Sequence, residues 1–564
     1  MSIKIDLHSS YFSYYGSYLA FCHGPAYPNE SEGLYLRSVH NQTRERMIFR
    51  VELWKDGQKA DFTDATAPEQ MTLNVSGAIG TLDAAFRDAK RIVIGTDNIT
   101  LRLYVVNHNN FNIYNLPQGE NLMLLNSYPG RIKLMMHVKR GALEFVNEGE
   151  NGAYYQLTPA QDGKGLLLIT DMRTGYEDKE PCGEPGLYAK RNRDEFEAWL
   201  ADMYPAPAKY AAARELAAYT NWASVINPSG RIRRPSMLMS KRRMINVWNW
   251  DSLFNAAASM GRPQTAIDQY SVLFDYQDEF GATPDSINED DVCWSFCKPP
   301  FHGWALRKMM QLGKLDEGFI EQIYPKLGKF TDWWMTCRDC DNDGAPEYHH
   351  GNDSGWDNST VFDEGWLVES PDLCALLAIQ AEVLAGLAGR LGKPAAEAEK
   401  WQALKQKLLS VLIHELWDGE TFFARHAITH KRVYCQSMLP NIAVIAAYMY
   451  PEDMQDKLAA IFEKENSFLT PYGVATENVN SDKLKYNGYW RGPIWAPSTM
   501  AVVDGLYNIG RADLSEKIAQ RFCDMAAVSG MAENFDPLTG EALCDPSYTW
   551  TSSVFMILAN GYLG

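Results

Sequence analysis

Several common functional signatures are missing from this chain of 564 residues. It contains no glycine-rich phosphate loop, no Gly-x-Ser-x-Gly elbow, no His-Glu-x-x-His motif and no dinucleotide-binding fingerprint. These absences speak against nucleotide binding, serine-hydrolase chemistry and zinc-protease chemistry. The sequence also lacks a run of about 18 uncharged apolar residues, so we expect no membrane span.

Positive charge is scarce. Lys and Arg number 53 against 71 Asp and Glu, which leaves a formal net charge of −18. Such a chain repels nucleic-acid phosphates and anionic lipid surfaces, so we expect neither nucleic acid nor membrane as a partner. The first residues lack the apolar segment of a signal peptide, and the ten cysteines are spaced irregularly. These features predict a cytoplasmic protein with reduced thiols.

The pattern of apolar and polar residues changes twice along the chain. Residues 1–185 form short alternating runs separated by Asn, Gly, Asp and Pro, which predicts an antiparallel β-sandwich that ends in the Gly-, Pro- and Glu-rich stretch 174–186. Residues 186–240 have helical period and are predicted as a helical linker. Residues 241–564 alternate helices with long polar loops, and wide apolar faces predict a double-layered helical barrel. The clearest helical ranges are 305–312, 372–391, 394–412, 439–449, 453–463, 497–508 and 512–528.

The loop 349–362 carries the first catalytic candidate. Asp357 follows Trp356 and precedes Asn358 and Ser359. An acid that is shielded from water beside an indole has a raised pKa, so it can hold the proton that a departing glycosidic oxygen needs. The alternative is a turn carboxylate that caps a helix, which Asp-Asn-Ser sequences also favour.

A second candidate lies far downstream. Glu533 precedes a loop with turn chemistry, Asn-Phe-Asp-Pro-Leu-Thr-Gly. A base that activates water must stay ionised, and the end of a polar loop suits that requirement. Acidic loop residues are common, so the interpretation of Glu533 depends on that of Asp357.

Aromatic residues indicate the type of ligand. The chain has 16 Trp and 29 Tyr, and flat sugar faces stack on such rings while sugar hydroxyls bind polar side chains. Two strings, 247–254 and 489–497, flank a charged residue with tryptophans; the alternative is ordinary packing at helix starts. The predicted substrate-binding residues are Trp248, Trp250, Asp251, Phe254, His350, Trp356, Tyr489, Trp490, Arg491 and Trp495.

One segment resembles half of a calcium loop. Asp339, Asp341 and Asp343 alternate before a glycine, and His350 stands where an EF-hand has its closing glutamate. A structural Ca²⁺ bound by these carboxylates, the Ala345 carbonyl and Glu347 is one interpretation, and an ordinary acidic turn is the other. Such an ion would brace the loop that leads to Asp357.

Four strings together resemble glycoside hydrolase family 63, with family 37 trehalases as more distant relatives. They are Trp250-Asp-Ser-Leu-Phe, Ser354-Gly-Trp-Asp-Asn-Ser, Trp490-Arg-Gly-Pro-Ile-Trp and Glu533-Asn-Phe-Asp-Pro-Leu-Thr-Gly, and they span about residues 240–564. The resemblance implies an N-terminal β-sandwich followed by an (α/α)6 barrel, and an inverting mechanism with Asp357 as general acid and Glu533 as general base. It also implies that Asp285 can reach the cleft, while region 287–304 departs from the family pattern.

The sequence therefore predicts an inverting exo-α-glycosidase that cleaves a terminal α-glucosidic bond in a small soluble glucoside or oligosaccharide, with no required cofactor. Three alternatives stay open: a glycoside phosphorylase, a hydrolase of α-mannosides or glycosylglycerates, and a non-catalytic sugar-binding protein. The oligomeric state does not follow from the sequence.

Overall fold

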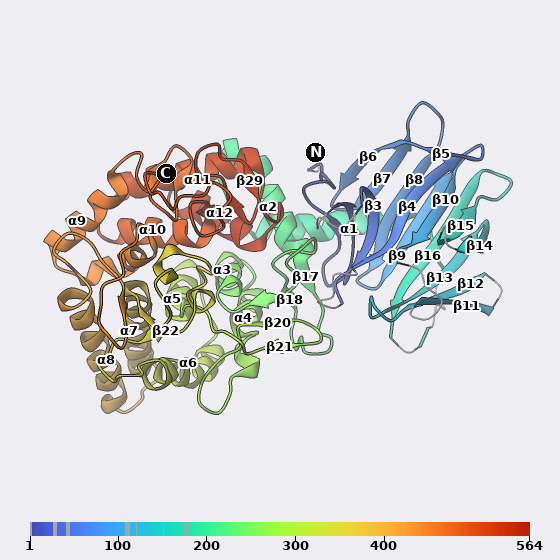
Figure 1. The fold of residues 1–564 in the computed structure, drawn as a ribbon. Helices are drawn as coiled ribbons and strands as arrows, with labels where there is room; N and C mark the ends of the chain where they lie inside the picture. Colours follow the sequence, from blue (N-terminus) through green and yellow to red (C-terminus); the bar gives the residue numbers. More distant parts are fainter. Residues whose placement is uncertain are drawn as a thin grey trace. The chain divides into compact units, whose positions relative to one another are not determined.

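The computed structural model describes residues 3–25, 31–40, 46–107, 113–119, 121–149, 152–173, 175–176 and 181–563. The chain divides into two compact units, which are described separately (Figure 1). The first contains residues 1–201, 218–246 and 288–290, and the second contains residues 202–217, 247–287 and 291–564. Residues 174 and 177–180 of the predicted boundary stretch lie outside the described residues. The segment 186–240 contributes to both units, and the domain boundaries at 185 and 240 stay a prediction.

The first unit is an antiparallel β-sandwich, as predicted. Its strands alternate buried and partly exposed residues, as in β10, where Leu101 and Leu103 are buried and Arg102 and Tyr104 are not. The strand order is β1-β2-β3-β4-β10-β15-β14 in one sheet, where β5 pairs with β4, and β11-β12-β13-β16-β9-β8-β7-β6 in the other. The strands are β1 (Phe12–Ser13), β2 (Leu19–Gly24), β3 (Gly33–Ser38), β4 (Met47–Lys55), β5 (Gln58–Ala60), β6 (Phe62–Ala67), β7 (Gln70–Val75), β8 (Thr81–Asp88), β9 (Arg91–Asp97), β10 (Thr100–Val105), β11 (Ile113–Gly119), β12 (Leu122–Ser127), β13 (Ile132–Arg140), β14 (Ala142–Asn147), β15 (Ala153–Thr158) and β16 (Lys164–Met172).

A helix covers part of the second sheet. In α1 (Pro185–Asp202), Tyr188 packs on a buried cluster of residues from β8, β9 and β16: Ala85, Val93, Leu166 and Leu168. Gly95 of β9 allows this approach, because a Cβ there would lie 3.1 Å from Cδ of Pro185. The same unit also contains β17 (Val225–Ile226) and β18 (Ser236–Met237), which pair with each other.

The second unit is an (α/α)6 barrel, which confirms the predicted fold class. Six helices form a closed inner ring in which each contacts the next and the last contacts the first: α3 (Asp251–Ala258), α5 (His302–Leu312), α7 (Pro371–Arg390), η6 (Leu439–Met449), α10 (Ala496–Asn508) and α12 (Thr549–Gly561). Asn255 closes the ring by donating to Thr549 Oγ1 at 3.0 Å. Around it lie α4 (Pro263–Ser271), α6 (Glu317–Cys337), α8 (Ala395–His414), α9 (Glu452–Glu463) and α11 (Ala512–Ser529); α2 spans Ala211–Ser224.

The named helical ranges all fall on helices. The inner helix α7 is buried along most of its length because alanines and leucines face α5, α6, α8 and η6. By length and composition alone α7 is also apolar enough to cross a membrane, but 83% of its most apolar 18-residue window is buried within the fold. Its apolar character therefore reflects a position between two layers of helices.

Long loops precede the inner helices, and short sheets cross-link them. The sheet β19 (Val247–Trp248), β20 (Ser286–Ile287) and β21 (Val292–Cys293) joins the loops before α3 and α5. The sheet β22 (Glu347–Tyr348), β23 (Val368–Glu369) and β24 (Arg425–His426) joins the loops before α7 and η6. The sheet β27 (Ile494–Trp495), β28 (Asn534–Phe535) and β29 (Ala542–Leu543) joins the loops before α10 and α12, and β25 (Leu469–Thr470) pairs with β26 (Gly473–Val474).

Candidate active site

Glu533 lies directly before β28 and is 4% exposed. Pairing of β27 with β28 places Trp495 opposite Asn534, so the glutamate is held beside the end of the 489–495 segment. Its Oε1 accepts a hydrogen bond from the Tyr489 hydroxyl at 3.1 Å, and its Oε2 accepts one from the Asp545 backbone N–H at 3.2 Å. Burial, reinforced by the charge of Asp545, raises the pKa of Glu533 to about 8.

Asp357 lies in an irregular loop and keeps 33% of its side chain exposed. The loop needs a glycine at 355, because φ is +72° there and a Cβ would lie 2.6 Å from the ring of Trp250. Lys298 is the nearest cation that pairs with Asp357, with Nζ 4.0 Å from Oδ1. Burial raises the pKa of Asp357, and the Lys298 charge opposes that rise. The predicted direction of the pKa shift is thus the one found.

The turn at Tyr489 lies near the carboxyl groups of both Asp357 and Glu533. Tyr489 has a left-handed backbone with φ of +66°, and its hydroxyl reaches Glu533. Burial and then the charges of Glu533 and Asp357 raise the pKa of Tyr489, so both carboxyls lie within its electrostatic reach. Asn358 fastens the turn to the Asp357 loop, since its Oδ1 accepts from the Trp490 N–H at 2.9 Å and its Nδ2 donates to the Gly488 carbonyl at 3.0 Å. The structure therefore brings the two candidates together around residues 488–495.

Arg491, predicted to bind sugar, braces this same junction. Its Nε donates to the Asn358 carbonyl at 2.7 Å, and its Nη2 pairs with Asp363 at 2.5 Å. The guanidinium therefore supports the acid loop directly.

Three further charged groups complete the cluster. Asp251, in the first turn of α3, accepts from the Tyr548 hydroxyl at 3.1 Å, and burial raises its pKa to about 7. Asp285 is buried and lies 3.1 Å from Nζ of Lys298. Lys298, which sequence reasoning missed, also donates to the Asn352 carbonyl at 2.7 Å. The Asp285 and Asp357 carboxyl groups thus lie on the buried ammonium group of Lys298.

The predicted tryptophans pack on one another. Trp490 stacks on Trp495 with ring centroids 3.9 Å apart and on Trp356 at 4.8 Å, and Trp250 contacts Trp490 at 5.8 Å. All four are at most 3% exposed, so they form a buried aromatic layer; Trp356 directly precedes Asp357, and Trp495 pairs with Asn534 next to Glu533. Two other predicted residues flank this layer: Trp248 is half-buried in β19, and Phe254 has no exposed surface and packs against Phe301 and Trp304.

His350 belongs to a stack that the sequence did not indicate. Its ring lies 4.9 Å from that of Phe296 and 4.5 Å from that of Trp366, nearly parallel to both. Its Nδ1 accepts a hydrogen bond from the Asn352 N–H at 3.0 Å. Trp366 is 55% exposed, so this stack presents a ring face to solvent.

The predicted calcium loop lies beside a different set of ligands. Side-chain donor atoms of Asp341, Asp343, Glu369 and His430 lie within 4.8 Å of one another. Glu347 is turned to other partners, since its Oε2 accepts from the Cys340 N–H at 3.2 Å and its Oε1 lies 3.1 Å from Nε2 of His349. Ala345 and Asp339 are buried, and Asp339 Oδ2 accepts from the Gly344 N–H at 3.1 Å.

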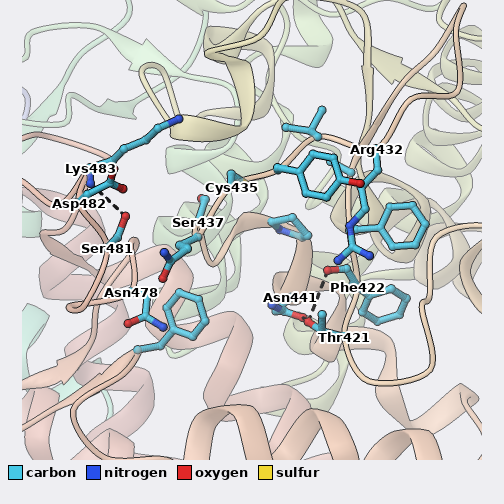
Figure 2. Close-up of a pocket in the computed structure, with 17 residues that line it drawn as sticks. Thr421, Phe422, Arg432, Cys435, Ser437, Asn441, Asn478, Ser481, Asp482 and Lys483 are labelled. Carbon is cyan, nitrogen blue, oxygen red and sulfur yellow. Dashed lines mark hydrogen bonds between the residues drawn. The ribbon is translucent and has the colours of Figure 1, made fainter.

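The barrel unit also contains a cavity of about 420 Å³ (Figure 2). Its wall comes from segments 421–424, 432–441 and 478–483 together with Phe468, and includes none of the predicted site residues. Ser437 in this wall is hydrogen-bonded to Ser359 at 2.8 Å. The cavity is therefore separate from the carboxyl cluster, and this hydrogen bond links its wall to the loop that carries Asp357.

Comparisons with known proteins identify the family of the barrel unit. Residues 244–551 match the family model described as the mannosylglycerate hydrolase MGH1-like glycoside hydrolase domain. A mannosylglycerate hydrolase from Rubrobacter radiotolerans is 25% identical over 34% of this chain and 43% of its own length. A glucosylglycerate hydrolase from Mycolicibacterium hassiacum is 20% identical over 46% of this chain and 74% of its own. The chain thus spans under half of the first relative and about three quarters of the second.

Two solved structures have the same fold. The family 63 mannosylglycerate hydrolase from Thermus thermophilus, in complex with glucose, has a TM-score of 0.54 at 20% identity and covers 61% of this chain and 99% of its own. A bacterial glucoamylase in complex with acarbose has a TM-score of 0.63 at 10% identity and covers 98% of this chain and 93% of its own. At these identities the likeness concerns the fold alone.

Proposed function

This chain belongs to the mannosylglycerate hydrolase MGH1-like glycoside hydrolase family, and from that premise we propose that it removes a terminal α-linked hexose from a small glycoside with inversion of configuration. The resemblance to glycoside hydrolase family 63 is thereby confirmed. The observation that carries the proposal is the convergence of Asp357 and Glu533 on Tyr489, because glycoside hydrolysis uses two carboxyl groups at one site; inversion is what the resemblance to family 63 implies.

In this proposal Asp357 is the general acid. It donates its proton to the glycosidic oxygen as the bond to the anomeric carbon breaks. Partial exposure lets it contact a leaving group, and Lys298 beside it limits how far burial raises its pKa. Asp251 is suited to accept hydrogen bonds from hydroxyls of the hexose that is released.

Glu533 is the general base, which removes a proton from the water that attacks the opposite face of the anomeric carbon. A pKa of about 8 keeps most of the free protein in the wrong protonation state at pH 7, because the base must be ionised. The competent form needs Glu533 ionised and Asp357 protonated. The Tyr489 and Asp545 hydrogen bonds favour the ionised glutamate, since both groups donate to it.

Two classes of leaving group are compatible with the family. The names of the relatives make mannosylglycerate and glucosylglycerate the first substrates to test, and a small α-glucoside or oligosaccharide is the second class. Incubating the protein with α-glucosides, α-mannosides and both glycosylglycerates, and following the first anomer by NMR, tests substrate and stereochemistry together. Release of a hexose that keeps the α configuration would refute inversion.

The two non-hydrolytic alternatives make different predictions. A phosphorylase needs cationic groups where phosphate enters, whereas Glu533 is surrounded by Asp545, Asp251 and Tyr489. We therefore expect product release to be independent of added phosphate. A sugar-binding protein would release no product at all in the same assay.

We also propose a structural Ca²⁺ at the loop 339–345, with a revised ligand set. Asp341, Asp343 and Glu369 supply the oxygen ligands that Ca²⁺ prefers, and Oε1 of Glu369 is buried without a hydrogen-bond partner. Oδ1 of Asp339, which the sequence also suggested as a ligand, is likewise buried without a hydrogen-bond partner, but Asp339 is not part of the cluster of four. Arg425, which pairs with Asp343 and Glu369, competes for the same oxygens. The ion would fasten the loop after α6 to β23, on either side of Asp357 in the chain.

A further inference from the structure

The stack Phe296–His350–Trp366 presents an exposed ring that the hydrolytic chemistry itself does not use. A 55% exposed indole in the barrel unit gains little from burial, yet Trp366 is held in one orientation by stacking on His350 with an interplanar angle of 22°. An exposed ring that is held in a fixed orientation is suited to bind a ligand with a flat face.

The turn that carries Trp366 is conformationally costly. Gly365 has φ of +142° and Leu367, a branched residue, has φ of +61°. The Ala427 N–H donates to the Leu367 carbonyl at 2.8 Å and holds the strained residue in place. Strain of this kind persists where surrounding structure enforces it, and it concentrates at ligand sites.

The stack lies on the acid side of the site. His350 is joined to the Asp357 side through Asn352, whose N–H donates to His350 Nδ1 and whose carbonyl accepts from Lys298, and Nζ of Lys298 lies 4.0 Å from Asp357 Oδ1. The groups that act on Glu533 are instead Asp545, Tyr489 and Asp251. Because the acid contacts the oxygen of the leaving group, a surface beside the acid and away from the base faces the leaving group.

His350 also offers a hydrogen-bond donor there. Its Nδ1 accepts from the Asn352 N–H, so in the neutral ring Nε2 carries the proton. Lys298, by contrast, is engaged with Asp285 and the Asn352 carbonyl and is poorly placed to neutralise an additional anion. A leaving group at this place therefore gains a stacking face and a neutral donor.

We propose that Phe296, His350 and Trp366 form the binding platform for the leaving group, and that this group is a neutral pyranose ring. The inference rests on the proposed glycosidase function and chooses between its two substrate classes. Glycerate has three carbons and no ring face, and its carboxylate would approach the Asp285 and Asp357 carboxyl groups. A second sugar stacks on the exposed face of Trp366, while His350 Nε2 donates to one of its oxygens.

The test compares three leaving groups on one hexose: a second sugar, glycerate and fluoride. The α-glycosyl fluoride has no leaving group to stack, so it reports the hydrolytic site alone. The variants are W366A, W366F, which keeps a flat ring, and the matched control F280A, which removes an aromatic residue that is 70% exposed in the same unit. Kinetic constants are measured for each, with glucosyl and mannosyl fluorides both included.

We expect W366A to lower kcat/KM for the disaccharide about tenfold, mainly through KM, which is the scale of one lost stacking contact. W366F should restore most of this loss, F280A should change nothing, and the fluoride should be hydrolysed by W366A within about twofold of the unmodified protein.

Equal losses by W366A on the disaccharide and the fluoride would overturn the inference, because Trp366 would then only support the site. Preference of the unmodified protein for the glycosylglycerate over every disaccharide would overturn it as well. Failure to hydrolyse either fluoride would instead refute the proposed function, which is a distinguishable result.

Discussion

Asp357 and Glu533 both lie near the turn at residues 488–495, but they differ in exposure and in the contacts that fix each side chain. Asp357 sits in an irregular loop, one third exposed, with the Lys298 ammonium 4.0 Å away. Glu533 is 4% exposed, directly precedes a paired β-strand and accepts two hydrogen bonds. Asp357, the proposed acid, is thus accessible and lies beside an opposite charge, whereas Glu533, the proposed base, is fixed by backbone pairing and its pKa is raised by burial.

The largest effect is expected from removing either carboxylate, and two kinds of substrate distinguish the general acid from the general base. D357N should lose about 10²–10⁴-fold in kcat on natural glycosides, yet hydrolyse the α-glycosyl fluoride almost normally, because fluoride leaves without a proton. E533Q should fail on both. Steady-state kinetics on both substrates measures this, and a fluoride-active E533Q beside an inactive D357N would reverse the assignment.

The next largest effect is expected at Tyr489, whose hydroxyl influences the pKa of Glu533. A donor to the ionised form lowers a pKa, so removing the hydroxyl in Y489F should raise the pKa of Glu533 further above about 8. The limb of the kcat/KM profile due to the base should move to higher pH, with loss of activity at pH 7. T499S, at a buried hydroxyl that bonds the Trp495 carbonyl, is a control that should leave the profile unchanged.

A smaller effect concerns stability. The pKa of Glu533 rises from 4.5 to about 8 on folding, so its contribution to stability is complete below 4.5 and is lost as the pH rises through 8. E533Q cannot ionise, and its melting temperature should exceed that of the unmodified protein at pH 9 and approach it at pH 5. D357N, at the more exposed site, should show less of this divergence; equal curves for E533Q and the unmodified protein would contradict the burial argument.

The smallest effect is expected from Ca²⁺. Adding Ca²⁺ after chelation should raise the melting temperature by a few degrees through binding to the folded state. E369Q should abolish that shift, whereas E317Q, at an exposed acid on the outer helix α6, should preserve it. A shift that persists in E369Q would place the ion elsewhere.

Sequence patterns were enough to predict the fold class, which the structure confirms, and to name the two catalytic candidates, which stay a prediction. Asp357 and Glu533 each lie in a polar turn beside aromatic residues, a pattern visible within ten residues of sequence. The contributions of Lys298 and Glu369 were not visible in this way, because they depend on contacts with residues 59 and 26 positions away, Asp357 and Asp343. The left-handed backbone of Tyr489 and the exposure of Trp366 also arise from tertiary constraints that composition does not encode.

The pairing of α12 with α3 has a consequence for synthesis. Asn255 and Thr549 are separated by 294 positions, and the inner ring is complete only when they meet. Closure of so long a loop is slow, and on the ribosome it must wait until the last helix has emerged. Until α12 is made, the apolar flanks of α3 and α10 have no α12 to cover them, so a nascent chain is expected to need protection from aggregation up to that point.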